Sequence, residues 1–238
     1  IAMQIAVVDG AHVTGVDAST DDAFLGDWRA PATEIEANFH AALKSHLVTG
    51  EYHVAGQRGR LAPQDFVTPA DLVIAPSPSP ETRKLIHPDL PDEAIKQAGA
   101  PVLVVPTDWR PGVWGKNVVV AWNGDREARR AVRDALPILK RAEEVTVFVF
   151  SRTNSNLRSA ADLLLTHLAR HGVTAHVSDW INTGDVTAIE ALFASLDTQS
   201  ADLLVAGAFG HSRVFETLFG SVSLDLLRQP ALPVLMSH

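Results

Sequence analysis

Three glycines near the end of the chain are spaced as in a loop that binds an anion. Gly207, Gly210 and Gly220 follow the apolar run 203–206. Glycine adopts backbone angles closed to other residues, so successive N–H groups can turn inward and form a nest for an anion. Ser221 and Ser223 stand where the next helix is expected to begin, and they would add hydroxyls and the positive end of that helix to the nest. The pattern predicts a phosphate site.

Two ionisable residues lie inside this glycine-spaced stretch. Arg213 could neutralise phosphate charge, or it could be a solvated surface residue. His211 is more typical of a hydrogen-bonded loop residue than of an acid or base. The stretch therefore favours binding over catalysis.

Familiar catalytic patterns are absent from the sequence. Gly115-Lys116 lacks the preceding glycine of a P-loop, and neither a dinucleotide fingerprint nor a nucleophile elbow occurs. His167 and His171 have helical metal spacing, but Leu168 stands where a zinc protease has its glutamate. An arginine stripe at helical spacing fits a solvated helix face better than a polyanion site; its members are Arg126, Arg129, Arg130 and Arg133. We expect no catalytic residue and no metal ligand.

The composition limits the classes of partner. There are 28 acidic and 20 basic residues, for a net charge of −8, which argues against nucleic acid or an anionic membrane as a partner. The absence of cysteine excludes disulfides and thiolate chemistry. No apolar run is long enough to span a membrane, and no leader pattern occurs, so a cytoplasmic protein is expected.

The second half of the chain alternates strand and helix patterns. Strands are expected at 117–122, 145–150, from 173, at 203–206 and at 234–236, with helices at 126–141, 156–171, 185–200 and 222–228. Continuously apolar strands between helices are typical of a parallel sheet covered on both faces. We predict a doubly wound α/β fold with about five parallel strands.

The first half repeats this pattern. The run 70–75 recurs at 201–206, Pro101–Val104 recurs as Pro233–Met236, and Val13-Thr14 recurs as Val145-Thr146, always 131 or 132 residues later. Collinear matches at one period indicate a duplication. The sequence thus divides into modules at 1–108 and 117–238, joined by a linker at 109–116.

The first copy is expected to be degenerate. It has helix patterns at 33–47 and 93–98, but its loop Pro76–Pro80 has no glycine and loses three N–H donors, so one site per chain is expected. The counterpart of strand 117–122 falls before residue 1, and about 20 residues are therefore expected to be absent from the N-terminus. The edge of Pro233–Met236 is expected to pair modules within a chain, or between chains in a homodimer.

The pattern Gly207-x2-Gly210-x9-Gly220-Ser221 resembles the nucleotide-binding signature of the universal stress protein family, and the two-copy layout is similar to that of its tandem members. Asn123-Gly124 after the first strand and the closing 233–238 also match. The resemblance implies an adenine nucleotide alpha hydrolase-like fold, with phosphates and ribose held by Gly207, Gly210, Gly220, Ser221 and Val222. Asn123 would lie against adenosine, where the family's nucleotide binders usually have Asp.

The resemblance implies binding of ATP or a related nucleotide (AMP or ADP), with Mg²⁺ accompanying the phosphates. Binding would serve a stress response or signalling rather than fast catalysis, with at most weak ATPase activity. Two alternatives stay open, a slow ATP hydrolase and a nucleotide-free interaction scaffold.

Overall fold

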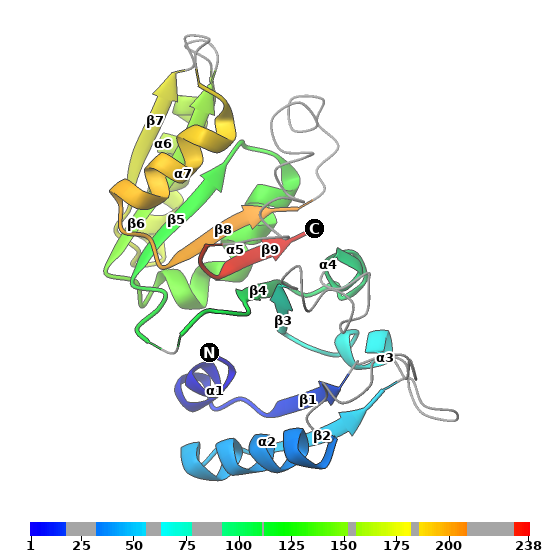
Figure 1. The fold of residues 1–238 in the computed structure, drawn as a ribbon. Coiled ribbons are helices and arrows are strands. Elements are labelled where there is room, and N and C mark those ends of the chain that lie inside the picture. The colour runs from blue at the N-terminus through cyan, green and yellow to red at the C-terminus, as the bar shows by residue number, and fades with distance from the viewer. Residues whose placement is uncertain are drawn as a thin grey trace.

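The computed structural model shows an α/β protein in which helices flank parallel strands (Figure 1). It describes residues 1–17, 32–55, 63–77, 92–110, 112–151, 156–181, 186–208 and 231–238.

The second half contains the five parallel strands that the sequence predicts. The strands lie side by side in the order β9-β8-β5-β6-β7. The elements are β5 (Asn117–Trp122), α5 (Arg126–Leu139), β6 (Glu144–Ser151), α6 (Leu157–Arg170), β7 (His176–Ile181), α7 (Ala188–Thr198), β8 (Leu203–Gly207) and β9 (Val234–Ser237). The helix expected at 222–228 lies outside the described residues.

Helices cover both faces of these strands. Ala191 and Leu192 of α7 pack in one buried cluster with Phe148 of β6. The opposite face carries α5 and α6, whose Leu139 and Leu168 belong to a second cluster. Figure 1 shows α7 in front of the sheet and α5 behind it. The two-faced burial predicted from the continuously apolar strands is confirmed.

Two boundaries in this half differ from the sequence prediction. The third strand begins at His176 rather than at residue 173, because Val173 closes the end of α6 through its N–H bond to Leu168 O. α7 begins at Ala188, behind the N-cap Thr187. Thr187 Oγ1 accepts from Glu190 N at 3.3 Å, and Thr187 N donates to Glu190 Oε2 at 2.8 Å. The backbone N–H and the hydroxyl of Thr187, which both donate to Glu190 Oε2, hold the pKa of Glu190 below its ordinary 4.5.

The first half is built from shorter elements. They are α1 (Ala2–Asp9), β1 (Val13–Asp17), α2 (Ala32–His46), β2 (Gly50–Val54), α3 (Pro63–Val67), β3 (Val73–Ser77), α4 (Asp92–Gln97) and β4 (Val102–Pro106). The helices predicted at 33–47 and 93–98 are confirmed. The expected loop Pro76–Pro80 begins too early, because Pro76 and Ser77 still pair with β4.

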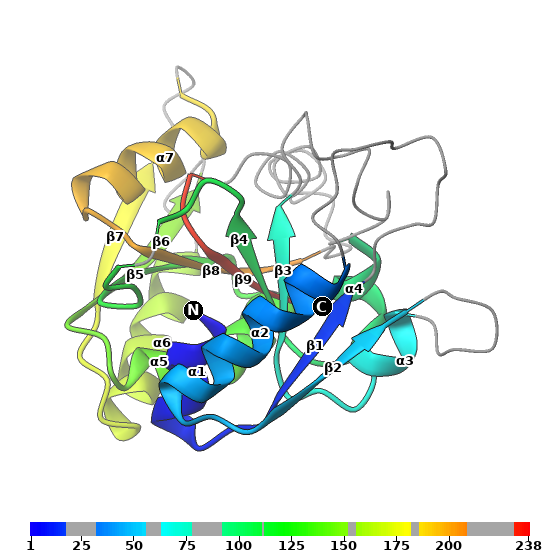
Figure 2. The same cartoon turned by 60° about the horizontal axis from the view of Figure 1, so that its bottom comes forward.

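The strands of the first half lie in two separate sheets. Among the described residues β1 pairs only with β2, whereas β3 and β4 extend the sheet of the second half to seven strands, β3-β4-β9-β8-β5-β6-β7 (Figure 2). The junction is antiparallel, with Leu103 of β4 opposite Leu235 of β9. These two residues are 132 positions apart, so each faces its own repeat counterpart. The expected pairing through the terminal strand therefore occurs within the chain.

Polar contacts also join the halves. Arg141 at the end of α5 binds Asp9 at the end of α1, with Nη1 2.8 Å from Oδ1. These residues are again 132 positions apart. Arg130 donates to the carbonyl oxygen of Gly99, and Gln4 donates to that of Gly112. Arg141–Asp9 and Leu103–Leu235 each join two positions that the sequence repeat matches, as expected for a local two-fold relation.

No helix in the described part of the chain has both the length and the apolar character that a membrane span requires.

Candidate functional site

The carboxyl ends of β5, β8 and β9 lie at one edge of the sheet. Val120 of β5 pairs with Val205 of β8, and Gly207 of β8 pairs with Ser237 of β9. Open α/β sheets bind ligands outside the carboxyl ends of their strands. The structure therefore brings the turn after β5 and the end of β8 to neighbouring positions.

Three of the nine candidate site residues lie in the described part of the chain: Asn123, Gly124 and Gly207. The other six fall outside it, and their arrangement stays a prediction: Gly210, His211, Arg213, Gly220, Ser221 and Val222.

Asn123 closes a tight turn at the end of β5. Its Oδ1 accepts from the backbone N–H of Asp125 at 3.0 Å, and its Nδ2 donates to Asp125 Oδ2 at 2.7 Å. Gly124 between them has φ +79°, a left-handed conformation that favours glycine. Asp125 is the N-cap residue of α5, as expected, but its side chain makes no capping bond. Much of the polar capacity of Asn123 is thus used inside the turn.

The first arginines of α5 also bind the protein itself. Arg129 donates from Nε and Nη2 to the carbonyl oxygen of Gly124, at 2.9 and 2.6 Å. Arg126 Nη2 lies 3.1 Å from Oε1 of the buried Glu127. These contacts argue for a structural use of the arginine stripe rather than a polyanion site.

Gly207 has a packing role that the sequence did not indicate. A Cβ atom at this position would lie 2.6 Å from Ala128 N and 2.6 Å from the carbonyl carbon of Glu127. Its φ is outside the left-handed region. The residue must be glycine because the first turn of α5 passes directly over the end of β8.

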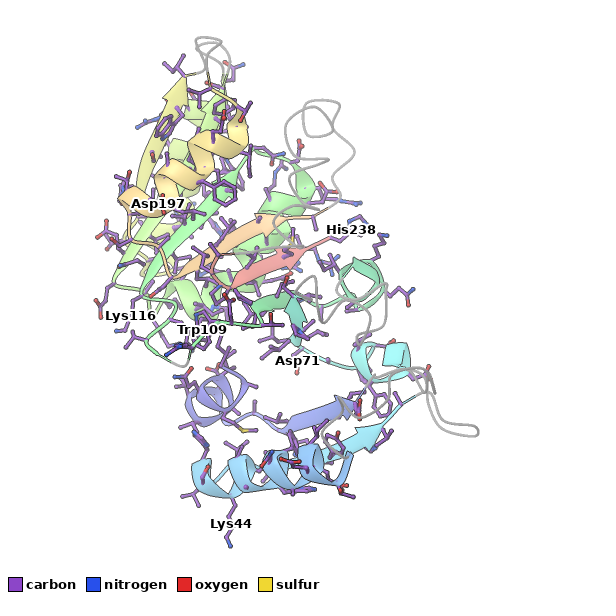
Figure 3. The ribbon with its side chains drawn as sticks, viewed as in Figure 1. Lys44, Asp71, Trp109, Lys116, Asp197 and His238 are labelled. Carbon is purple, nitrogen blue, oxygen red and sulfur yellow. The ribbon has the colours of Figure 1, made fainter. Side chains whose placement is uncertain are left out.

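The end of β9 contributes residues that sequence reasoning missed. Ala208 N donates to Ser237 O at 2.8 Å, and His238 Nδ1 donates to Ala208 O at 3.1 Å. His238 lies at the carboxyl end of β9 (Figure 3). In the sequence, only the expected parallel sheet, with the last strand beside β8, could have indicated this contact.

Two buried polar atoms at these strand ends have no hydrogen-bond partner in the described part of the chain. They are Trp122 Nε1 on β5 and Ser237 Oγ on β9. Their side chains are 8% and 1% exposed. A buried donor without a partner is unfavourable by about 1–3 kcal/mol, so both atoms are candidates to bind polar groups.

The described residues contain no group of three metal-ligating side chains. His167 and His171 contact each other edge to face, with ring centroids 4.7 Å apart.

No family model matches the sequence, and no curated protein matches it. Solved structures do match. A universal stress protein from Archaeoglobus fulgidus DSM 4304 has a TM-score of 0.71 at 15% identity, with coverage of 99% of this chain and 90% of that one. A putative universal stress protein from Pseudomonas aeruginosa UCBPP-PA14 has a TM-score of 0.59 at 16% identity, with coverage of 98% and 86%.

A functionally unknown protein from Pseudomonas aeruginosa PAO1 has a TM-score of 0.54 at 15% identity, with coverage of 98% and 85%. All three likenesses extend over both halves of the chain. The chain therefore has the fold of the universal stress proteins along nearly its whole length.

Proposed function

We propose that this chain is a tandem universal stress protein whose second module, 117–238, binds one adenine nucleotide, ATP or a close relative. The first module, 1–108, serves packing or partner contact. Nucleotide binding would bias one conformation or assembly by its differential affinity, as in a signalling protein rather than a fast catalyst.

The proposal rests on one observation. The Asn123–Asp125 turn and Gly207 end neighbouring parallel strands, and the glycine-spaced segment follows directly from Gly207. A nucleotide at the carboxyl edge of the sheet could reach the turn with one end and the glycine segment with the other.

The described groups fit such a ligand in part. Trp122 Nε1 is a donor, and Ser237 Oγ can donate or accept; phosphate, ribose and adenine offer acceptors for both. Asn123 keeps one N–H beyond its bond to Asp125. The carboxylates of Asp125 and Glu127 would disfavour phosphate close to the first turn of α5, so we place the phosphates on the glycine segment. Mg²⁺ could accompany them there.

The contrast between the halves supports a single site. Gly207 of β8 has Pro76 of β3 as its counterpart, and proline lacks the N–H that an anion nest requires. We therefore assign binding to the second half only.

Thermal unfolding with and without ATP, AMP or cyclic AMP tests the proposal. Ligand at 100 times its Kd should add about 2.7 kcal/mol to the free energy of unfolding. The variants Gly210→Val and Gly220→Val should lose the shift. Absence of a shift with every nucleotide would favour a nucleotide-free scaffold, and turnover abolished by both variants would favour a slow hydrolase.

A further inference from the structure

Two histidines lie side by side on the exposed side of α6. Leu164 and Leu168 bury one side of this helix in the core. His167 and His171 are exposed and stand four residues apart, so that one helical turn separates them. Their ring centroids are 4.7 Å apart. The two imidazoles therefore meet at the surface of the protein.

The ring nitrogens of this pair are not used by the protein itself. Neither imidazole makes a hydrogen bond or an ion pair in the described part of the chain. Each of the other described histidines has a ring nitrogen beside a hydroxyl, carbonyl or carboxylate oxygen. They are His12, His40, His46, His53, His176 and His238. Among the described histidines, His167 and His171 are thus the ones whose nitrogens remain available to a ligand.

The separation of the two rings fits joint binding of one metal ion. A metal ion lies about 2.0 Å from an imidazole nitrogen that binds it, and so about 3.2 Å from the centroid of that ring. Two rings bound to one ion at 90° or 109° would then have centroids about 4.5 or about 5.2 Å apart. The observed 4.7 Å lies between these two values.

Rotation of the rings would aim their nitrogens at a shared ion. The two ring planes are 66° apart in an edge-to-face contact. The torsion about the Cβ–Cγ bond of histidine has a broad energy profile. Because the ring centroid lies close to the axis of this bond, rotation turns the nitrogens and leaves the centroid nearly in place. The helix therefore need not change when an ion binds.

The end of α6 holds the backbone of the pair. His171 is the C-cap residue, and Gly172 follows it with φ +81°. Val173 N donates to Leu168 O at 3.0 Å and closes the last turn. A helix C-terminus carries partial negative charge, which favours a cation, although Arg170 in the same turn opposes this effect.

The leucine between the two histidines does not argue against metal binding. In the zinc protease motif His-Glu-x-x-His, the two histidines bind the zinc and the glutamate acts as the general base. Leu168 in place of that glutamate removes the hydrolytic chemistry and leaves both ligands. The sequence-based expectation of no metal ligand depended on Leu168, so it does not apply to metal binding without catalysis.

We propose that His167 and His171 form a surface site for one divalent transition-metal ion, with water in the remaining coordination positions. Imidazole suits Cu²⁺, Ni²⁺ and Zn²⁺, and the general order of affinities makes Cu²⁺ the tightest of these. Mg²⁺ and Ca²⁺ prefer oxygen ligands and should not bind here. α6 ends just before β7 begins, at the amino edge of the sheet. The site is therefore distinct from the carboxyl edge proposed for the nucleotide.

A Cu²⁺ titration of the nucleotide-free full chain tests the proposal. Paramagnetic Cu²⁺ broadens NMR signals close to it, so substoichiometric Cu²⁺ should broaden the imidazole C–H signals of His167 and His171 first and together. Calorimetry should give one tight site. His167→Gln and His171→Gln should each weaken Cu²⁺ binding on the order of 100-fold, because the second imidazole binds intramolecularly. His176→Gln, the matched control at another exposed histidine, should leave the affinity unchanged.

Leu163→His in the His171→Gln chain supplies a rescue. Leu163 is 73% exposed and stands one turn before His167, so the change rebuilds a histidine pair at the same spacing. Tight Cu²⁺ binding should return. The proposal would be overturned by equal broadening of all histidine signals, by unchanged affinity in either single variant, or by no recovery in the rescued chain. Loss of affinity in His176→Gln would also overturn it, because the ion would then lie beside Glu144.

Discussion

Replacing Asn123 by aspartate tests how the turn at the candidate site is held. Asn123 Nδ2 donates to Asp125 Oδ2 at 2.7 Å, so Asn123→Asp would place a carboxylate oxygen against another carboxylate. Two unit charges about 4 Å apart repel by about 4 kcal/mol at an effective dielectric constant of 20 and by about 1 kcal/mol in water. Because both side chains are half-buried, we expect a loss of about 1–3 kcal/mol in the free energy of unfolding at pH 7.

The matched control is the double variant Asn123→Asp, Asp125→Asn. It exchanges donor and acceptor and keeps the bond from the backbone N–H of residue 125 to the side chain of residue 123. Urea unfolding at pH 7 should place the double variant within about 0.5 kcal/mol of the natural protein. The single variant should recover stability as the pH falls and the two carboxylates come to share a proton. A single variant as stable as the natural protein, or a double variant no better than the single one, would refute this account of the turn.

Two further predictions concern packing and capping. Gly207→Ala should lower the free energy of unfolding by about 1–3 kcal/mol, because its Cβ would lie 2.6 Å from the backbone of α5. The control Gly112→Ala should change it by no more than about 0.5 kcal/mol, because its Cβ would meet nothing closer than 3.8 Å. Equal melting temperatures for these two variants would contradict the packing role of Gly207. Thr187→Ala should lose about 1 kcal/mol through the N-cap of α7. Because the pKa of Glu190 is lowered in the folded protein, its carboxylate should stabilise the protein fully above the ordinary pKa of 4.5. This stabilisation should be lost as the pH falls through the folded pKa. Glu190→Gln should remove this loss of stability in acid, and an unchanged dependence of stability on pH would contradict the role of Glu190.

Most of what could be predicted about the fold from the sequence came from the repeat period. The offset of 132 aligned Pro101–Val104 with Pro233–Met236, and the structure pairs Leu103 with Leu235 across the junction. The period did not predict that, among the described residues, β1 and β2 pair in a sheet separate from that of β3 and β4. Pairing between distant strands has no local signal in the sequence.

The candidate site was predicted less completely, because the sequence shows residue types but not their partners. Gly207 was interpreted as part of an anion nest, yet the described geometry requires glycine for the approach of α5. Asn123 was expected to face adenosine, and its amide proves to be engaged with Asp125. Glycine and asparagine suit ligand binding and tight turns equally well, and only the tertiary structure separates the two uses.

The number of adenine nucleotides bound per chain decides whether the second half holds a single site. Native mass spectrometry of the full chain, titrated with ATP, reports this number together with the identity of any retained ligand. We expect one nucleotide per chain, lost in Gly220→Val and retained in Pro76→Ala, the matched change at the corresponding strand of the first half. Two nucleotides per chain, none, or one that survives Gly220→Val but not Pro76→Ala would contradict a single site in the second half.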